Sequence, residues 1–312
     1  MPHKAIWVHA DATQEIKTIA GDYHPPKGDL LLKTICVALN PGDSNHPENL
    51  RAVNTVEGFD AVGKVVGIGR DTPGFKIGDK VLTFARGIGG AEWGASQEYF
   101  LALAATSWKF DYANLSEKQA AAIPLTLFTA CCALYNRLRP PLPLPWDAGC
   151  GSPILLWGAS SQVGIQAIQF AKFSGCRPII ATASPRERGS LFCIKSEHWL
   201  TLREQHEYLQ SLGADVLFDY RDKEIVNKLK GTVSGVKLQL AFKCVGASTE
   251  VLEQVVEPGG SIILALPPTS QSSTHHVEMA IAGTVHDLES FRAPDFKFHK
   301  ESNCVILMGL RS

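Results

Sequence analysis

Residues Pro153–Ser184 read PILLWGASSQVGIQAIQFAKFSGCRPIIATAS. The apolar run Ile154–Trp157 predicts a buried strand. Gly158–Gly164 follows as a tight turn, and apolar residues then recur at helical spacing as far as a helix stop at Gly175. A second buried strand is predicted over Pro178–Ala183. Strand, small-residue turn, helix and strand together form a βαβ unit.

The turn of this unit is a candidate dinucleotide site, because its backbone N–H groups and the following helix N-terminus suit a pyrophosphate. The glycine fingerprint is incomplete: Ser160 and Ser161 stand where a middle glycine is expected. An ordinary crossover with small residues for close packing is the alternative. Serine hydroxyls do not exclude phosphate, since they can donate to it. The predicted cofactor contacts in the turn are Gly158, Ser160, Ser161, Gln162, Val163 and Gly164.

Composition limits the class of protein. The 312 residues are enough for two domains, and 45% hydrophobic with 20% charged residues is ordinary for a globular protein. A formal net charge of −1 gives no electrostatic case for nucleic acid or an anionic membrane surface. The N-terminus lacks the apolar core of a secretory signal, and no apolar run approaches the ~20 residues that span a bilayer. A cytoplasmic protein without nucleic-acid or membrane partners is expected.

The eight cysteines form no C-x-x-C pair, and most lie in apolar runs. They are interpreted as buried thiols in a reducing compartment. Their spacing excludes a four-cysteine zinc lobe, and the histidines are scattered, so no metal site is predicted.

Residues 1–110 are rich in predicted strands, which glycines interrupt as they do in small barrels. The four predicted runs are Ala5–His9, Asp29–Ala38, Ala61–Ile68 and Lys80–Phe84. Ser116–Gln119 is a capping box that opens a helix, and Pro124 is expected to split that helix into two pieces. An extended linker follows over Arg139–Pro145.

After Ser184 the chain alternates between helices and strands, apart from an irregular segment at 187–204. Helices are predicted over 206–213, 223–230 and 249–256, and strands over 216–220, 237–245, 261–266 and 276–285. This alternation predicts an α/β fold with an open, mostly parallel, doubly wound sheet.

Several ordered motifs carry a family resemblance. They are Ala38–Asp43 (ALNPGD), Glu57–Val66 (EGFDAVGKVV), Phe75–Val81 (FKIGDKV), Ala121–Leu125 with Thr129 and Ala130, Gly158–Gly164, Leu212–Asp215 and Asp219–Arg221. By these motifs the chain resembles the zinc-free medium-chain dehydrogenases/reductases, the branch of the quinone oxidoreductases and the fungal trans-enoyl reductases.

The resemblance implies a GroES-like β-barrel catalytic domain over 1–124, with 287–312 as its partial return, and a Rossmann domain over 125–286. NADPH is expected in the cleft between them. Zinc-dependent members place a cysteine ligand where this chain has Asn40–Asp43, so alcohol oxidation at zinc is not expected. Hydride transfer to an activated acceptor is expected instead, since the acceptor's oxygen takes up the charge.

The end of the second Rossmann strand favours NADPH over NADH. NAD-binding folds usually carry an acid there for the ribose hydroxyls, whereas Ser184 and Arg186 offer a hydroxyl and a guanidinium to a 2′-phosphate. Tyr220 matches the family's adenosine-flanking tyrosine. A solvated arginine and a tyrosine that caps the core are the alternatives. Val245 and Leu266, which end later predicted strands, complete the expected cofactor contacts.

Two residues are expected to act at the reaction centre. Thr129 matches the family threonine that faces the nicotinamide, and Asn40 matches the asparagine beside the substrate, where it would help to stabilise the enolate. The alternatives are a threonine bonded to its own helix and an asparagine that makes a turn. Ser44 and Asn45 stand where many relatives carry Trp-Lys, which leaves the proton donor unassigned.

Two segments depart from the family. The insertion at 187–204 is interpreted as a retained intron or gene-model error, with a genuine insertion as the alternative. The stretch 286–312 contains one short apolar run, at 304–309, and predicts a truncated barrel return.

The leading hypothesis is an NADPH-dependent reductase of an enone or enoyl thioester, of the kind found in fungal secondary metabolism. A quinone reductase and a catalytically weak NADPH-binding or structural protein are the alternatives. A homodimer, formed through the sheet edge near Val277–Val285, or a monomer is expected.

Overall fold

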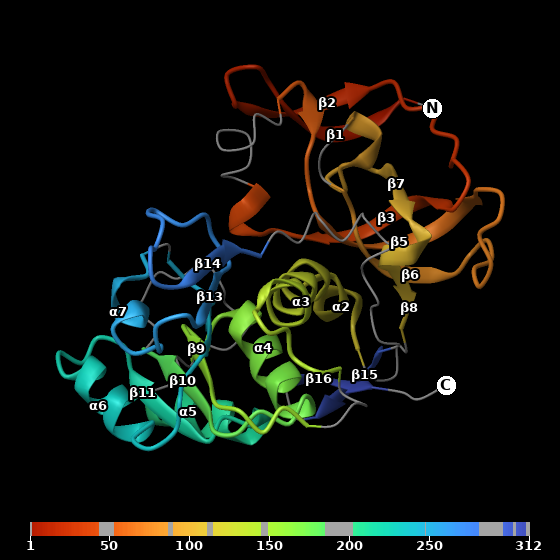
Figure 1. Ribbon diagram of the computed structural model, residues 1–312. Coiled ribbons are helices and arrows are strands. Elements are labelled where there is room, and N and C mark those ends of the chain that lie inside the picture. The colour runs from red at the N-terminus through yellow and green to blue at the C-terminus, as the bar shows by residue number, and fades with distance from the viewer. Residues whose placement is uncertain are drawn as a thin grey trace. The chain divides into compact units, whose positions relative to one another are not determined.

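A computed structural model describes most of the chain. The described residues are 2–43, 53–86, 90–110, 115–144, 149–184, 202–246, 248–280, 296–301 and 304–309. The chain divides into two compact units (Figure 1). The first is Met1–Leu125 with Asp295–Leu310, and the second is Thr126–Pro294 with Arg311–Ser312.

The first unit contains two antiparallel sheets. A five-stranded sheet has the order β7-β3-β5-β6-β8, and a three-stranded sheet has the order β2-β1-β4. The strands are β1 (His3–Val8), β2 (Gln14–Ile19), β3 (Asp29–Ala38), β4 (Thr55–Val56), β5 (Asp60–Ile68), β6 (Lys80–Phe84), β7 (Tyr99–Leu103) and β8 (Ser107–Lys109), with short helices η1 (Ala91–Trp93) and η2 (Ala104–Thr106). The four strands expected from the sequence are confirmed as β1, β3, β5 and β6.

The larger sheet encloses an apolar core. Leu30 and Leu32 on β3, Val65 on β5, Val81 on β6 and Phe100 on β7 are fully buried in it. The pairing of β3 with β5 is interrupted by register shifts at 31/32 and 34/36. The sequence analysis did not identify β2, β4, β7 and β8; of these, β2 has a mostly exposed edge pattern and β4 and β8 have only two and three residues.

The predicted helix with a break at Pro124 is confirmed. Ser116 caps α2 (Glu117–Ala121), since its Oγ accepts from Gln119 N and the Gln119 side chain accepts from Ser116 N. A second piece, α3 (Pro124–Cys131), begins at the proline, where the missing N–H costs nothing. It continues as a π-helix, η3 (Cys132–Arg137).

The second unit is built on six parallel strands in the order β11-β10-β9-β12-β13-β14. They are β9 (Ile154–Trp157), β10 (Ile179–Ala183), β11 (Val216–Asp219), β12 (Leu240–Lys243), β13 (Ser261–Leu264) and β14 (His276–Met279). Counted along the chain this is the order 3-2-1-4-5-6 of a dinucleotide-binding fold. The order reverses between β9 and β12, so a ligand crevice is expected at the carboxyl ends of those two strands.

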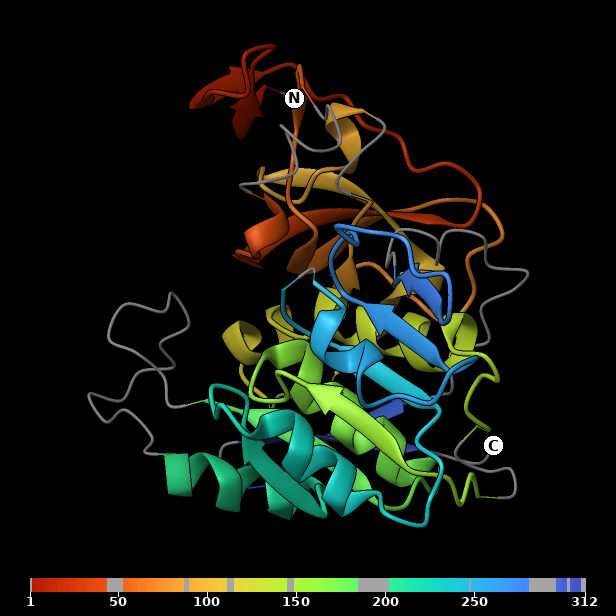
Figure 2. The ribbon, with the colours of Figure 1, turned by 60° about the vertical axis from the view of Figure 1, so that its left-hand side comes forward.

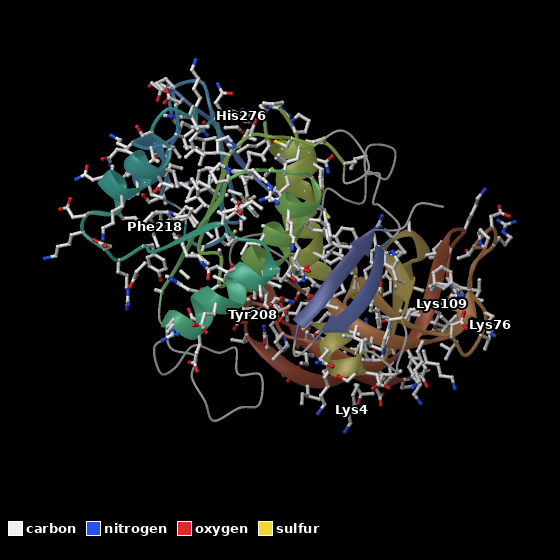
Figure 3. The ribbon with its side chains drawn as sticks, turned by 90° about the horizontal axis from the view of Figure 1, so that it is seen from below. Lys4, Lys76, Lys109, Tyr208, Phe218 and His276 are labelled. Atoms are coloured by element: carbon white, nitrogen blue, oxygen red, sulfur yellow. The ribbon has the colours of Figure 1, made fainter. Side chains whose placement is uncertain are left out.

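Helices cover both faces of this sheet (Figure 2), as the sequence predicted. They are α4 (Gln162–Phe173), α5 (Leu202–Leu212), α6 (Ile225–Thr232) and α7 (Glu250–Glu253). Strands β9 and β12, at the centre, bury every residue. Ile225 and Leu229 of α6 and Leu252 of α7 pack on one face against Leu155 of β9, and Phe218 of β11, labelled in Figure 3, packs against the same cluster.

The remaining strands lie at an edge and near the C-terminus. β14 is the edge strand of the six-stranded sheet, and 281–285 lie outside the described residues, so the dimer stays a prediction. β15 (Phe296–Glu301) and β16 (Cys304–Gly309) pair antiparallel. Among the described residues, no helix is long and apolar enough to cross a membrane.

Candidate functional site

The turn between β9 and α4 is held by a compact set of hydrogen bonds. Ser161 is the N-cap of α4: its Oγ accepts from Gly164 N at 3.1 Å and donates to Gly158 O at 2.9 Å. On the neighbouring strand, Thr182 Oγ1 accepts from Gly158 N at 3.0 Å and Thr182 O accepts from Ala159 N at 2.7 Å. These bonds leave the first N–H groups of α4, at the positive end of the helix dipole, for an anion.

Only glycine fits at both ends of this turn. Gly158 has φ +76°, and a Cβ there would lie 2.2 Å from Val245 Cγ2. A Cβ on Gly164 would lie 2.5 Å from the backbone Cα of Ala159. These are the roles of the first and third glycines of a dinucleotide fingerprint, the tight turn and the close approach of helix to strand. The serine at the middle position serves as the helix cap.

The other predicted contacts in the turn lie at its accessible rim. Ser160, Gln162 and Val163 are partly exposed, whereas Gly158 and Gly164 are buried. Val245, just beyond β12, stands against Gly158. The structure therefore brings together the residues that the sequence placed in the turn and one that it placed after a later strand.

A second predicted group lies at the end of β10 and β11. Ser184 Oγ donates to Tyr220 Oη at 2.8 Å, and the Tyr220 ring centroid is 5.9 Å from that of Trp157. Both Ser184 and Tyr220 are partly exposed. The structure thus pairs two residues that had been assigned separately to the ribose end of the cofactor. Arg186 lies outside the described residues.

The acid nearest in sequence to this pair has its own partner. Asp219, the last residue of β11, accepts from Arg221 Nη2 at 2.9 Å and from Arg221 Nε at 3.2 Å. The Arg221 side-chain hydrogen bond lowers the pKa of Asp219 below its ordinary value. Asp219 is therefore a paired carboxylate.

Leu266 lies apart from the turn at 158–164 along the sheet, and its role as a cofactor contact stays a prediction. It lies two residues beyond β13, with 48% of its surface exposed, and β12 separates β13 from β9. Lys243, which the sequence analysis did not single out, ends β12, is only 9% exposed, and places Nζ 5.7 Å from the Trp157 ring centroid. Burial lowers the pKa of Lys243. The detectable signal was a lysine inside the mainly apolar run LQLAFKCV.

The two residues expected at the reaction centre belong to different units. Thr129 lies on α3 in the second unit and is 8% exposed. Asn40, in the first unit, makes a turn after β3, in which Asn40 O accepts from Asp43 N at 3.0 Å and Asn40 N donates to Asp43 Oδ2 at 2.6 Å. The structure therefore supports a turn-making role for the Asn40 backbone. The side chain takes no part in these two hydrogen bonds.

The Asn40 side chain is anchored on a buried carboxyl group. Asn40 Nδ2 donates to Asp60 Oδ2 at 3.0 Å, and Leu125 N donates to Asp60 Oδ1 at 2.8 Å. Asp60 is fully buried at the start of β5, and burial raises its pKa well above the ordinary value. The sequence analysis quoted Asp60 only as part of a motif; an acid inside EGFDAVGKVV was the available signal.

Two further carboxyl groups are linked to this pair: Asp43 interacts with Asn40 and Asp60, and Glu57 interacts with Asp43. Burial raises the pKa of Asp43 to about 6. It also raises the pKa of Glu57 to about 7, and the charge of Asp43 adds to that rise. Gln14 Nε2 donates to Glu57 Oε1. Across the described ranges, no group of three or more His, Cys, Asp or Glu side chains is arranged to hold a metal ion.

Comparisons with known proteins match this architecture. Residues 26–112 match the model of the alcohol dehydrogenase GroES-like domain. The trans-enoyl reductase fsr4 of Gibberella fujikuroi is 31% identical over 279 residues, which cover 85% of this chain and 76% of that protein. The trans-enoyl reductase TOXD of Cochliobolus carbonum is 29% identical over a stretch that covers 88% of this chain and 84% of that protein.

Solved structures share the fold. An alcohol dehydrogenase superfamily protein from Novosphingobium aromaticivorans superposes with a TM-score of 0.71 at 21% identity, covering 93% of this chain and 82% of that one. The quinone oxidoreductase of Escherichia coli, solved with NADPH, has a TM-score of 0.63 at 18% identity. The match covers 90% of this chain and 80% of that one. Together with the GroES-like match and the 3-2-1-4-5-6 sheet, these similarities show that the chain belongs to the medium-chain dehydrogenase/reductase family.

Proposed function

We propose that this protein is an NADPH-dependent reductase of activated carbon–carbon double bonds that works without zinc. The observation that carries the proposal is the arrangement of residues at the C-terminal ends of the parallel strands in the second unit. There a turn with the required glycines opens α4 beside a Ser184–Tyr220 hydroxyl pair. A dinucleotide with an extra phosphate on its adenosine ribose is the ligand that these two features suit together.

The residues of the turn fit a pyrophosphate. Phosphate oxygens accept hydrogen bonds, and the first turn of α4 presents N–H groups at the positive end of its dipole. The Ser161 hydroxyl keeps that turn closed. A side chain at Gly158 or Gly164 would meet neighbouring atoms and push the turn out of this shape.

The ribose end fits a 2′-phosphate better than two free hydroxyls. Ser184 and Tyr220 supply hydroxyl groups there, and the nearby carboxylate of Asp219 is paired with Arg221. An unpaired acid at this place would repel a phosphate. Arg186, two residues after Ser184 in the sequence, is proposed to add a guanidinium.

At the reaction centre, when bound, NADPH supplies the hydride that the β-carbon of a conjugated carbonyl accepts. The buried Thr129 is proposed to hold the nicotinamide carboxamide through its hydroxyl. The developing enolate needs only hydrogen-bond donors, so no Lewis acid is required. Water is proposed as the proton source.

The substrate class rests on the relatives. Two of the proteins that cover most of this chain are named trans-enoyl reductases, and their names point to an enoyl substrate. The structural similarity to a quinone oxidoreductase makes a quinone the second candidate. A cytoplasmic enzyme acting on a small molecule is proposed.

The test is anaerobic NADPH oxidation with one probe of each class: crotonyl-coenzyme A, cyclohexenone and 9,10-phenanthrenequinone. Turnover of an enoyl or enone probe, unchanged after EDTA treatment, is expected. Turnover of the quinone alone would favour the second candidate. Tight NADPH binding without turnover of any probe would instead identify a catalytically weak NADPH-binding protein.

A further inference from the structure

We propose that Asp60 is a positioning residue that determines which end of the Asn40 amide is presented to a ligand. In the structure this is the carbonyl oxygen, Oδ1. With Asp60 ionised, the group that Asn40 recognises is then a hydrogen-bond donor, an N–H or O–H group, and not an enolate oxygen. The placement of Asn40 at a reductase site rests on the proposed function, whereas the control of its orientation does not.

The amide nitrogen of Asn40 faces carboxyl groups. Asp60 Oδ2 accepts from Nδ2 at 3.0 Å, and the Asn40 side chain also lowers the pKa of Asp43, which it faces as a donor. Turning the amide round would bring Oδ1 against two carboxyl groups, an arrangement of acceptors facing acceptors. Within the described part of the chain, the nitrogen is therefore the end that bonds to the protein, and the oxygen is the end proposed to meet a ligand.

Asp60 itself has no freedom to turn. It is 0% exposed, and Oδ1 accepts the backbone N–H of Leu125 at 2.8 Å, immediately after Pro124 at the start of α3. A backbone N–H can only donate, so this oxygen must accept. Oδ2 therefore accepts from Asn40. The buried carboxyl group of Asp60 thus bonds to the turn after β3 and to Leu125 near the start of α3.

The protonation of Asp60 and the orientation of Asn40 are coupled. A proton on Asp60 Oδ2 would have to be donated, and the Asn40 amide would then turn Oδ1 towards it. Burial raises the pKa of Asp60, and the charge of Asp43 adds to this, while the donors on Asn40 and Leu125 oppose it. Glu57 is coupled to the same group through Asp43.

The substitution Asp60→Asn separates this role from a packing role, because it keeps the shape. Its Oδ1 would still accept from Leu125 N, but its new NH2 group would donate to Asn40 and reverse the amide. Asp29→Asn is the matched control: Asp29 is also a buried carboxyl group, 5% exposed, at the opposite end of β3 from the turn.

The first readout needs no substrate. With asparagine labelled with ¹⁵N, the Asn40 side-chain N–H protons are expected to exchange with solvent about tenfold faster in Asp60→Asn than in the wild type. Asp29→Asn should leave them unchanged. Unaltered exchange and chemical shifts in a folded Asp60→Asn protein would overturn the proposal, whatever the enzyme reduces.

The second readout is a double-mutant cycle on the probe that turns over. Asp60→Asn is expected to lower kcat/KM by roughly 10- to 100-fold in the wild type but by less than about threefold in Asn40→Ala, because a positioning residue acts through its target. Additive losses would contradict the proposal. If no probe turns over, the proposed function fails while the exchange experiment still decides this inference.

Two further measurements show whether the hydrogen-bond donor that meets Asn40 Oδ1 belongs to the cofactor or to the substrate. The cofactor analogue with an acetyl group in place of the carboxamide lacks the N–H group. If the donor belongs to the cofactor, Asp60→Asn should weaken NADPH binding about tenfold and leave binding of the analogue unchanged. Equal weakening of both would contradict a cofactor source, and a rise in KM for the probe alone would assign the donor to the substrate.

Discussion

The turn at 158–164 and the carboxyl cluster around Asn40 are built in different ways. The turn is made by neighbours in the chain: Ser161 bonds to Gly158 and Gly164, three residues away on either side. The cluster joins Asp60 to Asn40 and Leu125, which are 20 and 65 residues away. A local motif can be detected in one sequence, whereas a cluster of distant residues becomes visible only when the strands pair.

The largest expected effect tests the local turn. Gly164→Ala should lower the free energy of unfolding by roughly 2–4 kcal/mol, because its Cβ would lie 2.5 Å from backbone that cannot move aside. Denaturant unfolding measures this. The matched control is Gly231→Ala in α6, where nothing lies within 4 Å of the new Cβ and a gain of up to about 1 kcal/mol is expected. Equal effects at both glycines would contradict the role given to Gly164.

The next effect tests the distant cluster through pH. Folded Glu57 keeps its proton up to a pKa of about 7, against an ordinary 4.5, so between these values the folded state binds more protons. The free energy of unfolding therefore falls as the pH rises through this window. Asp43 and Asp60, whose pKa values are also raised, contribute to the same fall. Glu57→Gln should therefore make the fall smaller without abolishing it, and should be more stable than the wild type at pH 8 by roughly 1–3 kcal/mol.

Urea unfolding at several pH values between 4 and 8 would measure the Glu57 effect. Glu117→Gln is the control of opposite sign. Hydrogen bonds from its own backbone and from Lys80 lower the pKa of Glu117, so its charged form is favoured and removing the charge should bring no gain at high pH. Parallel pH profiles for the wild type and Glu57→Gln would show that Glu57 is not responsible.

A smaller effect tests the pair Ser184–Tyr220, in which two residues at strand ends are brought together by strand pairing. Tyr220→Phe removes the hydroxyl that meets Ser184 and should weaken NADPH binding about fivefold, close to 1 kcal/mol, while NADH binding changes little. Fluorescence titration measures both affinities. Ser211→Ala, which removes an exposed hydroxyl bonded to Tyr208 O, is the control. Equal weakening for both cofactors would place the Tyr220 hydroxyl away from the 2′-phosphate.

The smallest effect tests a second local motif, the capping box of α2. Ser116→Ala removes the capping box of α2 and should lower the free energy of unfolding by about 1 kcal/mol. Thermal unfolding would measure it. A second variant, Ser116→Asp, retains an acceptor at the cap and should recover most of the loss. A loss that Asp does not restore would show that Ser116 stabilises the protein in some other way.

Several elements could be predicted because their signals are short-range. The Ser161 cap of α4, the capping box of α2 and the helix break at Pro124 each depend on residues within about one helical turn of one another. Strands β9 and β12, buried on both faces, could be recognised as continuous apolar runs. The edge strand β2 could not be recognised, because most of its residues are exposed and polar and show no distinctive alternation.

The candidate site was predictable only in part. Family motifs indicated Gly158 and Tyr220, and the end of the second Rossmann strand indicated Ser184. The hydroxyl pairing of Ser184 with Tyr220 spans 36 residues, however, and needs two parallel strands in register. Asn40 was indicated, whereas the orientation of its amide was not, and a role as donor to the enolate was expected. Among the described residues, Nδ2 donates to Asp60 Oδ2, and the presentation of Oδ1 to a ligand is a proposal that rests on this bond.

By itself, the sequence determined the alternation of elements, the glycines of the turn and the absence of an acid after β10, because these are properties of neighbouring residues. The tertiary structure decided the strand order, the burial of Lys243 and the meeting of Asn40, Asp60 and Leu125. The physical reason is desolvation. Whether a carboxyl group is an ordinary surface charge or a buried acceptor that orients its neighbour depends on which distant strands exclude water from it.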